Sequence, residues 1–114
     1  MKSNVGLYVR VSTDRQARLD EGSLKSQVQR LEEWVKLGNK VYQKHYSVYR
    51  IYQDVESGTT SQRPEYQRML NDVRANHLSA IVSVSISRLN RSLRDFYELQ
   101  EICERSNTAI ISLK

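Results

Sequence analysis

The sequence has one cysteine, one proline, four glycines and two histidines among its 114 residues. A single cysteine, Cys103, excludes an internal disulfide framework and any zinc or iron–sulfur site built from several cysteines. The histidines, His45 and His77, are too few for a histidine-rich metal site. No apolar run approaches the roughly 20 residues that a membrane-spanning helix needs, and the first residues do not resemble a signal peptide. We therefore predict a cytoplasmic protein with no membrane contact.

The charge that is present is mainly positive and mainly arginine. The chain carries 18 Lys and Arg against 13 Asp and Glu, a formal net charge of +5, and 12 of the 18 basic residues are arginine. The planar guanidinium can grip a phosphate at two points, which an ammonium cannot do. This balance favours a polyanionic partner, although a solvated basic surface would have the same composition.

Apolar periodicity predicts four short strands and three helices in alternation. The strands are expected at residues 5–11, 48–52, 80–84 and 109–113, where short β-branched runs are followed by polar residues. The first helix is expected at residues 23–37, with Ser23 as its N-cap and Gly38 as its stop. The second is expected to begin at Pro64. The third has the apolar face Leu93, Phe96, Tyr97, Leu99 and Ile102.

This alternation predicts a single α/β domain of three layers. We expect a mainly parallel central sheet of about four strands with helices on both faces. In such sheets, ligands bind outside the carboxyl ends of the strands. Three polar clusters fall there: residues 8–12 with Gln16, residues 54–58 followed by Arg63, and residues 87–91.

The first cluster contains an arginine inside a strand. Alternation places Tyr8, Arg10 and Ser12 on one face of the strand. A buried arginine is costly without an anionic partner. That partner is either an internal carboxylate such as Asp54, with Ser12 only capping a turn, or an anionic substrate.

The other clusters add arginines to the same edge of the sheet. Arg63 directly precedes Pro64, and Arg88 and Arg91 would share the first turn of a helix that begins near Asn90 or earlier. Each alone could be a solvated basic turn. Together with Arg10 they predict a phosphodiester site, with Ser12 as nucleophile and the arginines stabilising the transition state.

Other chemistries are less well supported by the sequence. Neither histidine follows a strand end near Ser12, which argues against a Ser-His-Asp triad. The chain has no Walker A or GxGxxG pattern, so we expect no nucleotide cofactor. Asp54 and Glu56 are the only acids near the predicted site, which makes a two-metal nuclease the weaker alternative and leads us to predict no metal.

These motifs resemble those of the serine recombinases, the resolvase/invertase family. Residues 8–12 with Gln16 resemble the family's nucleophile motif, residues 54–58 with 63–66 its second block, and residues 87–92 its third. The resemblance runs from about residue 5 to residue 113. The connector at residues 38–46 is similar to the large serine integrase or transposon branch.

The resemblance implies a mechanism and a set of roles. Ser12 would attack a DNA phosphate to give a 5′-phosphoserine link and a free 3′ hydroxyl, and strand exchange and religation would need neither metal nor ATP. The implied catalytic arginines are Arg10, Arg63, Arg88 and Arg91. Gln16 and Tyr8 would bind the substrate. The residues that would orient these groups without touching the substrate are Asp54, Ser57 and Ser87. The implied partners are double-stranded DNA and a second copy of the chain, with homodimers pairing into tetramers. The general base for Ser12 is left open.

Two departures from the family pattern qualify this expectation. Most members carry Asp where this chain has Ser87, although Ser occurs in some transposon-borne relatives. The family's catalytic domain also continues into a long dimerisation helix and a DNA-binding region, so residues 1–114 are expected to be a truncated catalytic domain. The alternative is a non-catalytic DNA-docking or oligomerisation module of the same fold.

Overall fold

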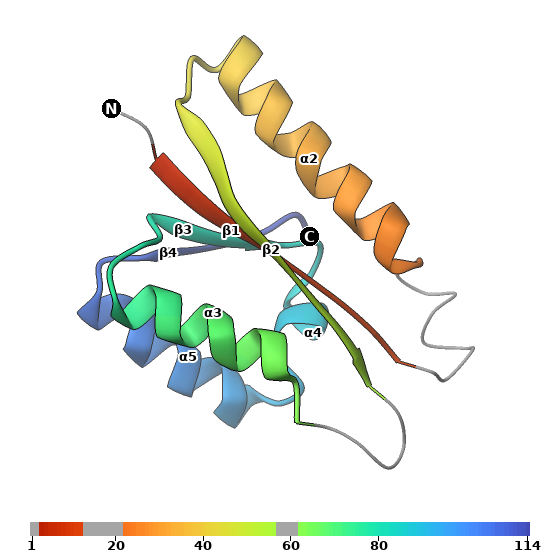
Figure 1. Cartoon of the computed structure of the whole chain (residues 1–114), viewed down its shortest axis with the longest axis vertical. Coiled ribbons are helices and arrows are strands. Elements are labelled where there is room, and N and C mark those ends of the chain that lie inside the picture. Colours follow the sequence, from red (N-terminus) through yellow and green to blue (C-terminus); the bar gives the residue numbers. More distant parts are fainter. Residues whose placement is uncertain (1–2, 13–21, 57–61) are drawn as a thin grey trace.

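The computed structural model describes residues 3–12, 22–56 and 62–114. Its strands are β1 (Ser3–Ser12), β2 (Tyr46–Glu56), β3 (Ala80–Ser83) and β4 (Ala109–Ser112). Its helices are α2 (Leu24–Val41), α3 (Pro64–Arg74), α4 (Ile86–Leu89) and α5 (Leu93–Arg105). The strands form one parallel sheet in the order β2-β1-β3-β4. The predicted three-layer α/β fold is confirmed, with α2 on one face and α3 and α5 on the other (Figure 1).

The strand order explains where the helices lie. The chain moves from β1 to β2 in one direction and then back across the sheet to β3 and β4. Connections between parallel strands are almost always right-handed. When the chain reverses its direction across the sheet, the helices before and after the reversal therefore lie on opposite faces. The reversal point, between the carboxyl ends of β1 and β3, is where an open α/β sheet binds ligands.

Alternation along β1 divides the core into two halves. Leu7 and Val9 pack against α2, whereas Tyr8 packs with residues of α3 and α5 on the other face. The predicted separation of faces in this strand is therefore confirmed. Arg10 and Ser12 continue the Tyr8 face towards the end of the strand.

The pairing of β1 with β2 contains a one-residue shift. Val5 is opposite Val48, but Gly6 is opposite Arg50, so Tyr49 is an extra residue in β2. Beyond this point the register places Arg10 opposite Asp54 and Ser12 opposite Glu56. The shift therefore brings acidic residues beside the arginine and the serine.

The first helix is longer than the sequence indicates. Ser23 caps it as predicted, its Oγ accepting a hydrogen bond from the Ser26 N–H at 3.2 Å. Gly38 does not end the helix, which continues to Val41. A Cβ at Gly38 would lie 2.9 Å from the Tyr46 ring, so this glycine provides space for packing. The turn at the end is made by Gln43, whose φ is 54°.

The expected apolar face of the third helix is only partly buried. Leu99 and Cys103 are in the core, but Leu93 and Tyr97 are 66% and 57% exposed. At 100° per residue, Leu93 and Tyr97 point about a quarter turn or more away from the direction of Leu99 and Cys103. Within the part of the chain that the structure describes, no helix is long and apolar enough to cross a membrane.

Candidate active site

Arg10 joins the central strand to the segment that follows β3. Its side chain is buried, its Nε donates to the Arg88 carbonyl at 3.1 Å, and its Nη2 donates to the Ser87 carbonyl. The anionic partner is Glu56, whose Oε2 lies 3.5 Å from Nη1, and not the Asp54 suggested by the sequence. Burial lowers the pKa of Arg10 and the Glu56 charge opposes that effect. The guanidinium stays charged at any physiological pH.

A side chain from α2 fixes the backbone of Arg10. β1 pairs with β3 only from Val5 to Leu7, so the backbone of Arg10 lies beyond this ladder. The fully buried Gln27 accepts from the Arg10 N–H at 3.3 Å and donates to the Arg10 carbonyl at 3.0 Å. Sequence reasoning missed Gln27; a polar residue on an otherwise apolar helix face was the available signal.

Arg63 is held at the start of α3 by groups from several elements. Its Nη1 donates to Asp95 Oδ2 at 3.0 Å, its Nη2 donates to the Leu89 carbonyl, and its Nε donates to the Tyr8 hydroxyl at 3.3 Å. The guanidinium also lies 3.6 Å from the centre of the Tyr66 ring, a cation–π contact. Its φ of 50° is a left-handed conformation that costs a non-glycine residue about 1–2 kcal/mol. These contacts offset that strain.

Asp54 caps the same helix from the neighbouring strand. Its carboxylate accepts from the Glu65 and Tyr66 N–H groups at 3.0 and 2.9 Å, where Arg63 offers no side-chain cap. It also accepts a hydrogen bond from the Tyr8 hydroxyl at 2.7 Å. Burial, together with the Asp54 carboxylate, raises the pKa of Tyr8, which therefore keeps its proton. Asp54 thus reaches Arg63 through the Tyr8 hydroxyl, and it lies beside Arg10 in the sheet although the ion pair of Arg10 is with Glu56.

The third cluster, residues 87–91, does not lie on a single helix. Arg88 lies in the short helix α4, whereas Arg91 lies between α4 and α5. Two serine caps cause the break: Ser85 Oγ accepts from the Arg88 N–H at 3.3 Å, and Ser92 Oγ accepts from the Asp95 N–H at 3.1 Å. Arg88 is buried and Arg91 is exposed. The helix that would put both arginines in one turn is therefore not formed.

Glu56 is the point where the arginines meet. Its carboxylate lies 3.5 Å from Arg10, 3.7 Å from Arg63 and 3.7 Å from Arg91. Its backbone is the register partner of Ser12, the last residue of β1. Asp54 and Glu56 are two apart on a strand and so share a face. That alternation was the signal by which Glu56 could have been assigned to the site.

Asp95 is an acid of the site that sequence reasoning missed. Its Oδ2 accepts from Arg63 Nη1, from Asn90 Nδ2 at 3.1 Å and from the Arg91 N–H at 3.2 Å. Burial raises the pKa of Asp95, but these hydrogen bonds and the Arg63 charge more than compensate and hold it below the ordinary value. Asp95 therefore stays ionised and ties α5 to the arginines.

The structure brings most of the predicted site residues to one end of the sheet. Tyr8, Arg10, Arg63 and Arg91 are linked through Asp54, Glu56 and Asp95, and Arg88 and Ser87 adjoin Arg10 through their carbonyls. The Ser87 hydroxyl lies 3.0 Å from the Ser85 hydroxyl. Gln16 and Ser57 lie outside the described residues. In the described ranges, no three His, Cys, Asp or Glu side chains are grouped so that they could hold a metal ion.

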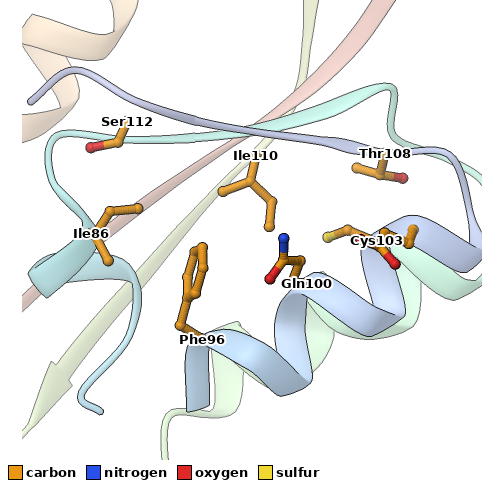
Figure 2. Close-up of a pocket in the computed structure, with 8 residues that line it drawn as sticks. Ile86, Phe96, Gln100, Cys103, Thr108, Ile110 and Ser112 are labelled. Carbon is orange, nitrogen blue, oxygen red and sulfur yellow. The ribbon is translucent and has the colours of Figure 1, made fainter. Parts of the chain in front are cut away.

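A separate pocket of about 340 Å³ lies between α5 and the outer strand β4. Figure 2 shows Phe96, Cys103 and Ile110 in its wall, with Ile86 and Ser112 towards one end. None of the clustered arginines is among its lining residues. This pocket is therefore separate from the arginine cluster.

Comparison with known proteins places the whole arrangement in a family. Residues 5–114 match the family model described as "Resolvase, N terminal domain". The chain is 27% identical over 107 residues to the Tn917 transposon resolvase of Enterococcus faecalis; the match covers 94% of this chain and 47% of that protein, about half of its length.

Solved structures show the same fold. The N-terminal catalytic domain of TP901-1 integrase superposes with a TM-score of 0.76 at 28% identity, covering 96% of this chain and 76% of that one. The C-terminal catalytic domain of ISC1926 TnpA, an IS607-like serine recombinase, superposes with a TM-score of 0.76 at 22% identity, covering 97% and 70%. The sheet order, the serine at the end of β1 and the arginines around Glu56 thus occur in a chain that belongs to the family of resolvase N-terminal domains.

Proposed function

We propose that this chain is the catalytic domain of a site-specific DNA recombinase with Ser12 as its nucleophile. The observation that carries the proposal is the convergence of Arg10, Arg63 and Arg91 on one carboxylate beside Ser12. Three guanidinium groups directed at one point form a site for a tetrahedral oxyanion. Arg88, buried next to Arg10, belongs to the same site.

The proposed reaction is a transesterification at phosphorus. Ser12 Oγ forms a bond to the phosphorus of a DNA phosphodiester and loses its proton, while the bond from phosphorus to the 3′ oxygen breaks and that oxygen leaves as a hydroxyl. The arginines stabilise the extra negative charge of the pentacoordinate transition state, and each well-placed donor is worth about 10²–10³ in rate. A 3′ hydroxyl of another strand reverses the step, so the bond energy is conserved without ATP or a metal ion.

The supporting groups have roles that follow from their contacts. Tyr8 and Asp54 orient Arg63, and Asp95 fixes the same guanidinium from α5. Gln16 and Ser57 remain predicted contributors to substrate binding and support. The partners that we propose are double-stranded DNA and a second copy of the chain, with dimers pairing into a tetramer, acting in the cytoplasm. The relatives named as a resolvase and an integrase support this substrate.

A non-catalytic DNA-docking module is the second candidate, favoured by Ser87 in place of the family's usual Asp. The geometry gives Ser87 a role that does not depend on its side chain, because Arg10 binds its carbonyl oxygen. The two candidates differ in one outcome: whether Ser12 becomes covalently attached to DNA.

The test is covalent trapping on a DNA duplex in which sulfur replaces one bridging 3′ oxygen. The thiol that leaves from such a site religates poorly, so the protein–DNA adduct accumulates. The chain is fused to a DNA-binding domain of known target placed next to the modified phosphate, so that binding does not limit the reaction. We expect a protein-linked 5′ end in the presence of EDTA, and its loss in Ser12→Ala.

Ser47→Ala, at the opposite end of β2, is the matched control and should form the adduct like the parent chain. Ser87→Asp tests whether the family's usual residue increases the yield. An adduct that persists in Ser12→Ala, or cleavage that requires a metal ion, would overturn the proposal. An adduct only in Ser87→Asp would favour the docking module.

A further inference from the structure

We infer that Glu56 is a resident counter-anion that occupies the phosphate position of the arginine cluster and yields it when an oxyanion binds. The inference rests on the proposed function only in naming a phosphate as the natural ligand. It concerns binding and does not require that Ser12 react. It also assigns a role to a carboxylate that the reaction scheme above does not use.

Arg10 and Arg63 are each oriented by contacts other than those with Glu56. Arg10 donates to the carbonyls of residues 87 and 88, and Arg63 donates to the carbonyl of residue 89. Carbonyl oxygens fix direction but carry no net charge. Arg63 is also held by the Asp95 carboxylate and the Tyr8 hydroxyl. Glu56 therefore supplies negative charge to guanidinium groups whose positions other contacts already set.

The contacts of Glu56 are loose for a carboxylate among arginines. A charge-assisted N–H···O bond is normally about 2.7–2.9 Å long, whereas the three arginines lie 3.5, 3.7 and 3.7 Å away. Among the described residues, Oε1 has no hydrogen-bond partner although it is buried. An acid that is attracted by three cations but bonded tightly to none can be displaced at low cost.

An anionic ligand would compete directly with this carboxylate. A phosphodiester carries one negative charge, as Glu56 does, so the exchange leaves the charge of the cluster unchanged. Both anions together would repel each other across a few ångströms in a partly desolvated site. Compared with a domain that lacks the Glu56 carboxylate, this domain is therefore more stable without ligand and binds phosphate less tightly.

The experiment compares Glu56→Gln with the parent chain, using sulfate as the probe. Thermal unfolding is followed in sodium sulfate and in sodium chloride of equal ionic strength, and the sulfate dependence of the midpoint gives the affinity. We expect Glu56→Gln to unfold at a lower temperature in chloride, because Arg10, Arg63 and Arg91 each lose one ion-pair partner, although Arg63 keeps Asp95. We expect it to bind sulfate about tenfold or more tightly than the parent.

Glu33→Gln is the matched control, because it removes the same charge from an exposed position on α2, across the sheet. It should bind sulfate like the parent. Equal affinity in all three proteins, or weaker binding in Glu56→Gln, would overturn the inference, since a purely structural Glu56 would not change anion affinity in this direction.

Two further measurements cover the case in which Glu56→Gln does not fold in chloride. Sulfate should then restore a cooperative unfolding transition, and failure to do so overturns the inference. Glu56→Asp keeps the negative charge but shortens the side chain by one methylene, which moves the carboxylate away from the arginines. It should bind sulfate with an affinity between those of the parent and Glu56→Gln. Failure of DNA trapping with the sulfate results intact would reject the recombinase chemistry and leave the role of Glu56 standing.

Discussion

Asp95 shows how one carboxylate can connect the arginine cluster to the protein's stability. It accepts hydrogen bonds from two side chains and one backbone N–H, and these hold its pKa below the ordinary value despite burial. A carboxylate with a lowered pKa stabilises the folded state fully above its unfolded pKa. That contribution is lost as the pH falls towards and through the folded pKa.

Asp95→Asn should therefore lower the free energy of unfolding by about 1–3 kcal/mol at pH 7. The difference from the parent chain should shrink as the pH drops below about 4, where the parent's own carboxylate becomes protonated. Urea unfolding of both proteins at pH 7, 5 and 3 measures this difference in the free energy of unfolding. Glu98→Gln, an exposed acid on the same helix, should show a small and nearly constant difference. A constant deficit for Asp95→Asn across this range would contradict the assignment.

The sequence predicted the arginines of the site better than their acids. Arg10 stands inside an apolar strand and Arg63 directly precedes a proline, so both are conspicuous. Glu56 was placed near the site without a role, and Asp95 resembles an ordinary surface acid. The significance of both depends on strand register and on a contact between α5 and the start of α3. Such contacts join residues far apart in the chain, and local pattern does not encode them.

At the scale of the element, the extra residue in β2 predicts different outcomes for two single-residue deletions in that strand. Deleting Tyr49 removes the residue that has no partner in β1 and leaves both halves of the ladder in register. Deleting Gln53 instead moves Asp54 and Glu56 back by one position and turns their side chains to the opposite face. We expect the first deletion to fold cooperatively and the second to lose the fold.

Circular dichroism and urea unfolding of the two deletion variants test this expectation. Gln53 is exposed and Tyr49 is 38% exposed, so neither deletion removes a core side chain. Equal damage from both would mean that the shift at Val5 and Gly6 is not what sets the register.

Gly38 gives a second prediction about an element. Gly→Ala inside a helix normally adds about 1 kcal/mol of stability. Here the added Cβ would lie 2.9 Å from the Tyr46 ring, which is itself stacked on Trp34 at a centroid distance of 4.9 Å. We expect Gly38→Ala to destabilise the protein by about 1–3 kcal/mol through overpacking.

Chemical denaturation of a double-mutant cycle with Tyr46→Ala checks the cause. In the Tyr46→Ala background the ring is gone, so Gly38→Ala should become neutral or stabilising. The same destabilisation in both backgrounds would rule out the ring contact. This glycine was misread as a helix stop because a stop and a packing gap look alike in a sequence.

At the scale of the molecule, the alternation of strands and helices was enough to predict the fold class. The strand order β2-β1-β3-β4 was not predictable, because the chain's return across the sheet is a choice among several right-handed windings. That return brings residues 87–89 to Arg10 and Arg63, more than 20 residues from either in sequence. Convergence of the three polar clusters was predicted, whereas the particular contacts depended on the winding.

The use of backbone oxygens to hold Arg10 and Arg63 has a consequence for how this domain can change during evolution. Every residue type offers a carbonyl, so a substitution at residue 87, 88 or 89 leaves the acceptor of each guanidinium in place. A substitution at position 87 therefore changes the local side chain while Arg10 keeps its backbone acceptor. Mutation at this edge of the sheet can adjust the chemistry of the site without first dismantling its architecture.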